Sequence, residues 1–462
     1  MSSPQHLAPR SDASLDAWLT YISQIHPREI ELGLERLSRV AQRLGLAKPA
    51  PVVITVAGTN GKGSTIKTLE AVLMASGYST GAYTSPHILR FNERIRLQGE
   101  EAADEDIVAC FARIEAVREP ESLSYFEFTT LAALLLFADK CVDFALLEVG
   151  LGGRLDAVNL IDPDCCIITN IALDHEDWLG KGRENIGAEK AGILRAATPF
   201  VFCDRDPPAS VLARAASLGL TPIAIGADFS AHVSAHVSAH VSTHVSPVES
   251  ADQWSFKGQA RNGGLITRDA LPIPNLFLDN VVGALQGLAC LDLLPAEEIL
   301  RRALNDLGLV GRFEKRRDLT TGRRVILDAA HNVAAAELLA RRLKTLFPVA
   351  DIRSQAKAES TPTIRLVLAA MSDKNIEDIV RALDPLVDIW YIAAFEGARA
   401  AGAREIHTRV STTLPKAMIR PFDSVLSAYR AACSDQPDEH AMIVVTGSFH
   451  TLAEVAALPD LD

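Results

Sequence analysis

The chain has 462 residues, of which 48% are hydrophobic and 23% are charged, and its formal net charge is −12. This composition is typical of globular proteins, and the length suits two to four domains. The acidic balance argues against a nucleic-acid surface, which needs a basic face. It does not exclude a locally basic cleft for a small anion, because charges beyond about 8 Å are largely screened at physiological salt.

The sequence shows no membrane span and no signal peptide. The longest strongly apolar stretch, 128–138, is too short to cross a bilayer. The first residues lack a basic head followed by an apolar core. Seven scattered cysteines, without a C-x-x-C pair, are typical of reduced core residues. We therefore expect a cytoplasmic monomer that binds neither membranes nor nucleic acid.

The first expected elements surround a glycine-rich loop. A helix is expected at 28–45, where apolar residues recur at helical spacing and a glycine follows. A β-branched run at 52–57 then leads into the loop, and an amphipathic helix is expected at 64–76. Strand, loop and helix in this order are typical of a site for the phosphates of a nucleoside triphosphate. The loop consists of Gly58, Thr59, Asn60, Gly61, Lys62, Gly63 and Ser64.

The loop composition suits phosphate binding. Gly58, Gly61 and Gly63 are expected to adopt backbone angles closed to other residues, which lets successive N–H groups face phosphate oxygens. Lys62 adds a charge worth roughly 4 kcal/mol at ~4 Å and an effective dielectric of ~20. The helix dipole adds only about 0.3–1 kcal/mol. The lysine should therefore dominate binding, together with any metal ion.

The loop departs from the common G-x-x-x-x-G-K-[ST] spacing. Residue 56 is Val, and Gly63 separates the lysine from the hydroxyls of Ser64 and Thr65, either of which can face Mg²⁺. The alternative is an ordinary glycine-rich turn between a strand and a helix. The preceding strand, the lysine and the hydroxyls favour the phosphate-binding interpretation.

Strands and helices then alternate along the first part of the chain. This alternation predicts a mostly parallel sheet that is covered by helices on both faces. Strands are expected at 81–84, 142–149, 165–171 and 199–203, and helices at 104–117, 128–140, 184–195 and 209–218.

A low-complexity segment at 229–246 interrupts the alternation with the tetrapeptides AHVS, AHVS, AHVS and THVS. Its histidines would form a metal-binding stripe on a helix. The composition favours an expanded surface loop, and a weak β-hairpin is a third possibility. The histidines are His232, His236, His240 and His244.

A second alternation starts near residue 296. We expect residues 1–295 to form a P-loop domain with the insert near 230–246, and residues 296–462 to form a smaller Rossmann-like α/β domain. A cleft between the two domains is the expected active site, since ligands bind outside the carboxyl ends of parallel strands. The second alternation has strands at 324–328, 364–370, 389–394 and 442–446, and helices at 296–306, 334–346, 376–383 and 424–433.

Three polar residues follow strands of the first domain. Ser85, Glu148 and His175 offer a hydroxyl, a carboxylate and an imidazole, which together could hold Mg²⁺ beside triphosphate oxygens. Each residue alone has a more ordinary interpretation, because a strand-end glutamate often forms a salt bridge and a lone histidine often lies in the core.

Three charged residues leave alternatives open. Lys190 in GAEKAGIL is either a surface lysine or a desolvated amine whose lowered pKa permits a carbamate with CO₂. Arg312 in GRFE suits either a polyphosphate or a linker salt bridge. Asp328 ends a strand in ILDAAHN, where a carboxylate suits a ribose hydroxyl.

Nine motifs together resemble one family. In chain order they are GTNGKGS, YTSPHILRFNERI, SYFEF, LLEVGLGGRLDAVN, ALDHEDWLG, EKAGI, GRFE, DAAHN and VTGSFHT. The same order is found in bacterial folylpolyglutamate synthases that are also dihydrofolate synthases, a branch of the Mur ligase superfamily. The resemblance spans about residues 20–455 apart from the histidine repeat, and the glycine after the lysine is typical of the folate branch.

The resemblance implies site roles and a Mur-ligase-like fold. It implies ATP on the loop residues from Gly58 to Ser64 and on Asn280, Arg312 and Asp328. It implies two Mg²⁺ ions held by Ser85, Glu148, His175 and a carbamylated Lys190, with Lys62, His175, Lys190 and Arg312 as catalytic residues. It implies a dihydropteroate pocket of Ile30, Glu31, Leu32, Ser124, Tyr125, Phe126, Glu127 and Leu155, beside a mobile loop at 150–159.

The implied reaction is ATP-driven amide formation. A phosphoryl group passes to a carboxylate of dihydropteroate or a reduced folate, and the amine of L-glutamate attacks the acyl phosphate. Alternatives are a monofunctional folylpolyglutamate synthase, a peptidoglycan-type amino-acid ligase, and a nucleotide switch, which would need an N-K-x-D motif that is absent. One departure from the family pattern is Val333, where proline is common.

Overall fold

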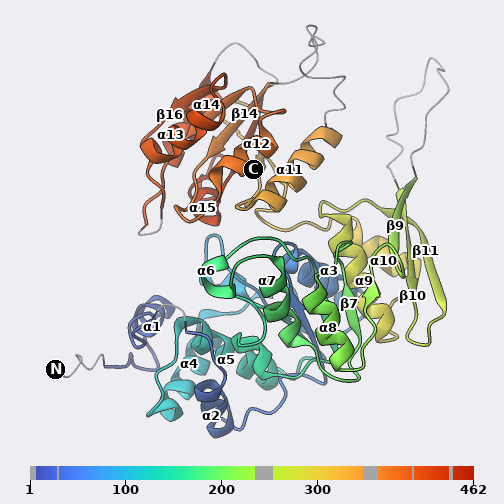
Figure 1. Ribbon diagram of the computed structural model, residues 1–462. Coiled ribbons are helices and arrows are strands. Elements are labelled where there is room, and N and C mark those ends of the chain that lie inside the picture. The colour runs from blue at the N-terminus through green and yellow to red at the C-terminus, as the bar shows by residue number, and fades with distance from the viewer. Residues whose placement is uncertain (1–6, 29–30, 235–252, 347–362, 398–399, 436–440) are drawn as a thin grey trace. The chain divides into compact units, whose positions relative to one another are not determined.

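The computed structural model describes residues 7–28, 31–234, 253–346, 363–397, 400–435 and 441–462. The chain forms two compact units. Unit 1 comprises Met1–His87 and Phe91–Leu307, and unit 2 comprises Ile88–Arg90 and Gly308–Asp462. Each unit combines helices with a mostly parallel sheet (Figure 1), which confirms the predicted α/β class.

Unit 1 is built on an eight-stranded sheet in the order β4-β3-β2-β5-β1-β6-β7-β8. The β2–β3 and β3–β4 pairs are antiparallel, whereas the remaining pairs are parallel. The central strands are buried except at the first residue of β1, which explains their continuous apolar runs. The strands are β1 (Val52–Ala57), β2 (Thr80–Tyr83), β3 (Ile95–Leu97), β4 (Glu100–Glu101), β5 (Phe144–Glu148), β6 (Cys165–Ile168), β7 (Phe200–Phe202) and β8 (Ile223–Ala224).

Ten α-helices belong to the described part of unit 1. The helix that follows the glycine-rich loop, α3, packs against α9 and α10, while α4 packs against α5 and α7 against α8. The helices are α1 (Leu15–Ile22), α2 (Glu35–Arg43), α3 (Lys62–Ala75), α4 (Asp104–Arg118), α5 (Tyr125–Asp139), α6 (Glu176–Leu179), α7 (Arg183–Lys190), α8 (Ala209–Ser217), α9 (Leu278–Cys290) and α10 (Glu297–Leu304).

The helix expected at 28–45 is too long, since α2 begins only at Glu35. Residues 31–34 lie outside the helix, and the Gly33 N–H there donates to the Leu155 carbonyl at 3.3 Å. The boundary between the units also differs from the expected 295–296. The chain enters unit 2 at Gly308, because α10 packs against α3 and β11 of unit 1.

The histidine repeat begins in a strand. β9 (Ser230–Ser234) pairs antiparallel with β10 (Gln253–Gln259), and β10 pairs with β11 (Leu265–Pro272) in a separate three-stranded sheet. His232 therefore lies on a strand, so the interpretation as a helical stripe is wrong at this position. His236, His240 and His244 lie outside the described residues.

Unit 2 contains a six-stranded sheet in the order β12-β13-β17-β14-β15-β16, in which only the β12–β13 pair is antiparallel. The strands are β12 (Glu314–Arg317), β13 (Arg324–Leu327), β14 (Ile364–Leu368), β15 (Ile389–Ile392), β16 (Met418–Pro421) and β17 (Met442–Thr446). The helices are α11 (Val333–Leu346), α12 (Ile376–Leu383), α13 (Ala403–Thr413), α14 (Val425–Ser434) and α15 (Phe449–Ala456).

The unit 2 sheet has an apolar core on each face. Ile326 and Leu366 pack with residues of α11, α12 and α13. Val325 and Val367 pack with residues of α14 and α15. Neighbouring residues thus alternate between the two cores with the period of two that a strand imposes. This confirms the expected Rossmann-like arrangement, with helices on both faces of the sheet.

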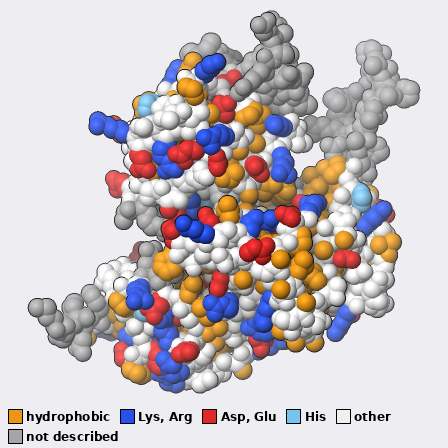
Figure 2. All heavy atoms as spheres, in the orientation of Figure 1, with side chains coloured by type: hydrophobic (Ala, Val, Ile, Leu, Met, Phe, Trp, Pro, Cys, Tyr) orange, Lys and Arg blue, Asp and Glu red, His pale blue; other side chains and the backbone are white. Residues whose placement is uncertain are grey.

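The surface and the cysteines agree with the composition. Figure 2 shows acidic and basic side chains mixed across the face in view, without a broad basic area. No helix among the described residues has the length and apolar character that a bilayer crossing requires. All seven cysteines are free and six are buried, whereas Cys141 is exposed and so is not a core residue.

Candidate active site

Four neighbouring strands of unit 1 end at one edge of its sheet. β2, β5, β1 and β6 lie side by side and run parallel. Val56 of β1 is level with Glu148 of β5, so the glycine-rich loop and Glu148 emerge next to each other. Ser85 follows β2, and Thr169 follows β6. The topology therefore gathers the predicted loop, Ser85 and Glu148 together with Thr169, as strand ends in parallel sheets do.

Two glycines of the loop are required by its shape. Gly58 has φ +147, and a Cβ there would lie 1.8 Å from Thr169 Oγ1. Gly61 has φ +88, and a Cβ there would lie 2.2 Å from Asn280 Oδ1. Both positions combine positive φ with close packing, which only glycine tolerates. The expectation for Gly63 is wrong, because this residue lies in the first turn of α3 and has no positive φ.

Polar residues after β6 hold the loop in place. The Asn60 N–H donates to Asn170 Oδ1 at 2.8 Å, and the Thr59 N–H donates to the Asn170 carbonyl at 2.9 Å. The Thr169 hydroxyl donates to the Asn60 carbonyl at 2.6 Å. Sequence analysis did not single out Thr169 or Asn170. Their position directly after a predicted buried strand was the available signal.

The two candidate hydroxyls differ in their surroundings. The Thr65 hydroxyl donates to the Gly61 carbonyl at 3.1 Å, a bond within the first turns of α3. It also lies 3.5 Å from the Asn280 carbonyl. Because Thr65 is engaged with the backbone, Ser64 is the better candidate for a metal ion or phosphate. Asn280 itself lies against the loop from α9, as its packing on Gly61 indicates.

Two lysine side chains meet at one backbone carbonyl. Lys62 Nζ donates to the Gly58 carbonyl at 3.0 Å and to the Thr59 carbonyl at 3.2 Å. Lys190 Nζ reaches the same Gly58 carbonyl at 2.9 Å from the last turn of α7. Lys190 is 5% exposed, so its interpretation as a surface lysine is wrong. The loop thus gathers two lysine amines close to where phosphates are expected.

Burial changes the charge of Lys190. Desolvation, followed by repulsion from Lys62, lowers the pKa of the Lys190 amine to about 7, while Asp174 and Asp156 oppose the shift. Burial likewise raises the pKa of Asp156 to about 6. Sequence analysis missed Asp156 and Asp174 as neighbours of the two lysines. Both lie in motifs that were noted, LLEVGLGGRLDAVN and ALDHEDWLG.

The expected metal residues occupy three segments near this edge. The Ser85 N–H donates to Glu148 Oε2 at 3.3 Å, and Glu148 is buried. His175 precedes α6 with φ +53, and its side chain is 40% exposed. No three His, Cys, Asp or Glu side chains gather as a metal site within the described ranges. Of the four expected metal ligands, only Glu148 and His175 belong to these residue types. The other two are the Ser85 hydroxyl and a carbamylated Lys190.

The segments expected to hold dihydropteroate meet around Arg36 and Gly33. Arg36 contacts Glu31 and Glu127, while Gly33 donates to the Leu155 carbonyl. Leu32 lies between these contacts and is partly exposed, and Ile30 lies outside the described residues. The three segments are therefore neighbours, although their residues are far apart in the sequence.

The SYFE motif also has a structural role. Ser124 is the N-cap of α5, and it forms a capping box with Glu127. Phe126 lies beside Tyr83 with 5.8 Å between ring centres, and a Cβ at Gly150 would come within 2.5 Å of its ring. Tyr125 lies under the Arg94 guanidinium at 5.8 Å. The S-x-x-E pattern could have predicted the cap from the sequence.

The loop at 150–159 is anchored in this structure. The Arg154 N–H donates to the Glu189 carbonyl at 2.8 Å, and the two side chains form an ion pair. Asn159 donates to the Arg154 carbonyl at 2.9 Å. Asp156 accepts from the Leu151 N–H at 2.8 Å. These contacts fix the loop beside α7, which carries Lys190.

Unit 2 carries the remaining predicted residues. Asp328 accepts from the Phe313 N–H at 2.8 Å, and burial raises the pKa of its carboxyl while Arg312 opposes the shift. The Arg312 guanidinium lies 4.7 Å from the centre of the Phe449 ring. α11 still begins at Val333, because Asn332 Oδ1 accepts from the Ala335 N–H at 2.9 Å. The missing proline therefore does not prevent helix initiation.

Both units match known protein families. Residues 56–250 match the Mur ligase middle domain, and residues 311–449 match the Mur ligase glutamate ligase domain. The dihydrofolate synthase/folylpolyglutamate synthase of Escherichia coli is 39% identical over 98% of this chain and 97% of that protein.

Two solved structures agree with this result. Escherichia coli FolC in complex with DHPP and ADP has a TM-score of 0.85 at 39% identity, covering 97% of this chain and 98% of that chain. A bifunctional folylpolyglutamate synthase/dihydrofolate synthase from Yersinia pestis, complexed with AMPPNP and Mn, has a TM-score of 0.83 at 40% identity, covering 98% of this chain and 99% of that chain.

Both units match Mur ligase domains, and the strand ends of unit 1 carry a glycine loop with a lysine. These two findings define an ATP-using ligase of the Mur type. Within that class, the chain belongs to the family of dihydrofolate synthase/folylpolyglutamate synthases. The family resemblance inferred from the nine motifs is confirmed.

Proposed function

We propose that this ligase joins L-glutamate to dihydropteroate and to reduced folates, with ATP as the energy source. The observation that supports this most directly is the convergence of Lys62 and Lys190 on the Gly58 carbonyl. Lys62 thereby places a positive charge beside a preformed loop, and Lys190 places a second group there that can hold a metal ion once it is carbamylated, and both serve the transfer of a phosphoryl group. Full-length similarity to enzymes named for both activities supports the substrates.

ATP binds to the loop in this proposal. The residues from Gly58 to Ser64 hold its phosphates through backbone N–H groups, and Lys62 adds its charge. Asn280 borders the same site, which agrees with its position against Gly61. Because the loop is fixed by Thr169 and Asn170, little reorganisation is needed when phosphate arrives.

The donor set fits Mg²⁺, which prefers oxygen ligands. Ser85, Glu148 and His175 would hold one ion, and a carbamylated Lys190 would hold a second. The buried Glu148 carboxylate, 3.3 Å from the Ser85 N–H, supplies an anion at the loop. Bound Mg²⁺ would neutralise charge on the transferred phosphoryl group.

Lys190 is suited to become a carbamate. An amine with a pKa near 7 is partly neutral at physiological pH, so its nitrogen can attack CO₂ and release one proton. The product is an anion. The repulsion between Lys62 and Lys190 is thereby replaced by attraction across the Gly58 carbonyl, which favours the modified form.

The pterin acid is held by the segments around Glu31, Ser124 and Leu155 in this proposal. Its carboxylate takes the γ-phosphoryl group of ATP, and ADP leaves. The glutamate amine then attacks the acyl phosphate, which forms the amide and releases phosphate. No protein nucleophile is needed. The residues of the chain bind, orient and neutralise charge.

Two residues of unit 2 also contact ATP in this proposal. Arg312 contributes a guanidinium to the phosphates, and Asp328 accepts a hydrogen bond from the ribose. We also propose that the enzyme acts as a cytoplasmic monomer, which size-exclusion chromatography and cell fractionation can check.

The test is an assay of ADP release. Dihydropteroate and tetrahydrofolate, each with and without glutamate, decide between a bifunctional and a monofunctional enzyme. A UDP-sugar peptide tests the peptidoglycan-type alternative and should give no ADP. A wild-type enzyme that releases ADP with this peptide, and not with either pteridine, contradicts the proposal.

Lys62→Ala should lower turnover by at least about 10²-fold, the usual loss for one group that stabilises transition-state charge. Lys48→Ala is the matched control, because Lys48 forms a partly exposed ion pair with Asp164. It should behave as the wild type. Unchanged ADP release in Lys62→Ala would refute the role of this lysine.

A further inference from the structure

Arg36 on α2 joins two segments of the chain that no motif connects. Its Nε donates to Glu127 Oε1 at 2.9 Å and to Oε2 at 3.0 Å. Its Nη1 donates to Glu31 Oε1 at 2.5 Å, and its Nη2 donates to the Glu31 carbonyl at 2.8 Å. One guanidinium therefore holds two carboxylates and one backbone group, which the planar fork of arginine permits.

Both carboxylates have further partners that fix their orientation. Glu127 Oε2 accepts from the Ser124 N–H at 2.8 Å as part of the capping box of α5. Glu31 Oε2 lies 3.0 Å from His26 Nε2. Hydrogen bonds from Arg36, and then from His26, keep the pKa of Glu31 below its usual value. Arg36 is thus the centre of a network from His26 to Ser124.

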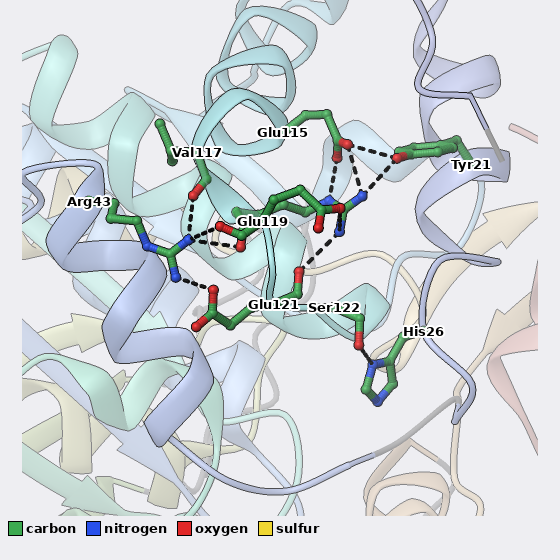
Figure 3. Close-up of polar contacts among 9 residues, drawn as sticks. Tyr21, His26, Arg43, Glu115, Val117, Glu119, Glu121 and Ser122 are labelled. Carbon is green, nitrogen blue, oxygen red and sulfur yellow. Dashed lines mark hydrogen bonds and ion pairs between the residues drawn. The ribbon is translucent and has the colours of Figure 1, made fainter. Parts of the chain in front are cut away.

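The far side of this network is also anchored. Figure 3 shows His26 meeting Ser122, whose Oγ lies 3.0 Å from His26 Nδ1, on the loop between α4 and α5. Arg43 of α2 contacts the carbonyl of Val117 in the last turn of α4 and that of Glu119 on the same loop, as the figure also shows. The loop that leads to Ser124 is therefore tied to α2 at several points.

Three of the side chains in this network are largely shielded, whereas Glu31 is 32% exposed. The exposed fractions are 17% for Arg36, 4% for Glu127 and 6% for His26. Ion pairs in such surroundings are screened less than those in water, so their geometry is held more firmly. Arg39, one turn further along α2, differs because its side chain is 55% exposed and pairs with Glu121.

We propose that Arg36 is a positioning residue for the pterin acid, which sets the spacing between the segment at Glu31 and the start of α5 at Ser124–Glu127. The inference rests on the proposed function, since both segments belong to the expected dihydropteroate pocket. Arg36 acts through Glu31 and Glu127 and leaves the phosphate loop untouched. A substitution away from the reacting atoms that displaces the substrate by about 1 Å can lower the reaction rate by up to about 10²-fold.

The experiment measures KM and kcat for each substrate in Arg36→Ala, Arg36→Lys and Arg39→Ala, together with unfolding temperatures. Arg36→Ala should raise the KM for dihydropteroate about tenfold or more, while the KM for ATP stays within about twofold. Arg36→Lys should recover part of the loss. Arg39→Ala removes the same charge from the same helix and should leave both KM values unchanged.

Two results overturn the inference. One is a folded Arg36→Ala enzyme whose KM for dihydropteroate equals that of the wild type. The other is an equal rise in the KM for ATP and for dihydropteroate, as general loosening would produce. If Arg36→Ala does not fold, Arg36→Lys decides, because a single ammonium cannot replace the planar fork that holds Glu127, the Glu31 carboxylate and the Glu31 carbonyl together. Raised KM for dihydropteroate supports the inference, and unchanged KM refutes it.

Titration of dihydropteroate with ADP present gives a readout that does not depend on turnover. Affinity should fall in Arg36→Ala and stay at the wild-type level in Arg39→Ala. A wild-type enzyme that neither binds nor turns over dihydropteroate refutes the proposed function, and the inference with it. A wild-type enzyme that does both, with Arg36→Ala unchanged, refutes the inference alone.

Discussion

The two units have the same kind of sheet, but different ionisable groups follow their strands. In unit 1, β1 leads into a glycine loop where Lys62 and Lys190 meet at the Gly58 carbonyl. In unit 2, β13 leads to the half-buried side chain of Asp328. The first edge suits an anionic phosphate, and the second suits a hydroxyl donor.

Burial acts on both edges in the same physical way. It disfavours the charged form, so the pKa of Lys190 falls and the pKa of Asp328 rises. The surroundings differ, because Lys190 faces another lysine whereas Asp328 has Arg312 and Arg342 nearby. The comparison indicates that the residues of the turn, and not the sheet, decide which ligand each unit can take.

The largest predicted effect concerns Lys190. Lys190→Ala should be inactive in the ADP-release assay, with a loss of at least about 10²-fold. Short carboxylic acids should partly restore activity, since they replace the anion of the carbamate. The control is Lys67→Ala on α3, which removes a lysine paired with Glu70 and should not respond to the acids. An active Lys190→Ala enzyme would exclude the carbamate.

The second prediction tests the corresponding edge in unit 2. Asp328→Asn should raise the KM for ATP about tenfold or more, because hydrogen bonds to charged groups contribute about 1.5–3 kcal/mol. The KM for dihydropteroate serves as the internal control and should change little. Steady-state kinetics with each substrate varied in turn measures both. Equal KM for ATP in variant and wild type would separate Asp328 from nucleotide binding.

The third prediction concerns the shape of the unit 1 loop. Gly61→Ala should lower the unfolding temperature and weaken ATP binding, because positive φ costs about 1–3 kcal/mol in other residues and Asn280 blocks the Cβ. Gly77→Ala is the matched control, with φ +90 and open space around it. This variant should lose only the stability that a positive φ costs a residue with a Cβ. If the two variants lose the same stability, contact with Asn280 is unimportant.

The smallest predicted effect is a pH dependence in unit 2. Glu377 forms a two-point contact with Arg409 at 2.7 Å, which lowers the pKa of its carboxyl from 4.5 to about 2. The contact therefore stabilises the fold above pH 4.5, and this contribution is lost as pH falls towards 2.

Glu377→Gln should flatten the acid side of the stability profile between pH 4.5 and 2. The difference should stay below about 1 kcal/mol, because a third of this side chain is exposed to solvent. Denaturant unfolding at several pH values measures it. Glu405→Gln is the control, since Glu405 contacts Arg409 at 3.5 Å and is more exposed. A Glu377→Gln variant whose free energy of unfolding falls between pH 4.5 and 2 as much as that of the wild type would contradict the prediction.

Local patterns predicted many elements well. The strand at 442–446 and the helix at 376–383 have the observed bounds, because apolar periodicity and a capping asparagine define them locally. The antiparallel sheet β9–β11 was not predicted. Strands β10 and β11 do alternate between more and less buried residues, but they follow low-complexity sequence, and this alternation was not used as a strand signal. The residues before α2 include Gly33, whose bond to Leu155 no local pattern contains.

The sequence by itself determined the α/β class, the phosphate loop and the family, since these depend on short motifs and on periodicity. Only the tertiary structure decided that Lys190 is buried beside Lys62, that α10 packs with unit 1, and that Arg36 bridges Glu31 and Glu127. The physical reason is common to all three. Burial and charge neighbours arise from contacts between distant parts of the chain, and these set the pKa of an amine or the position of a carboxylate.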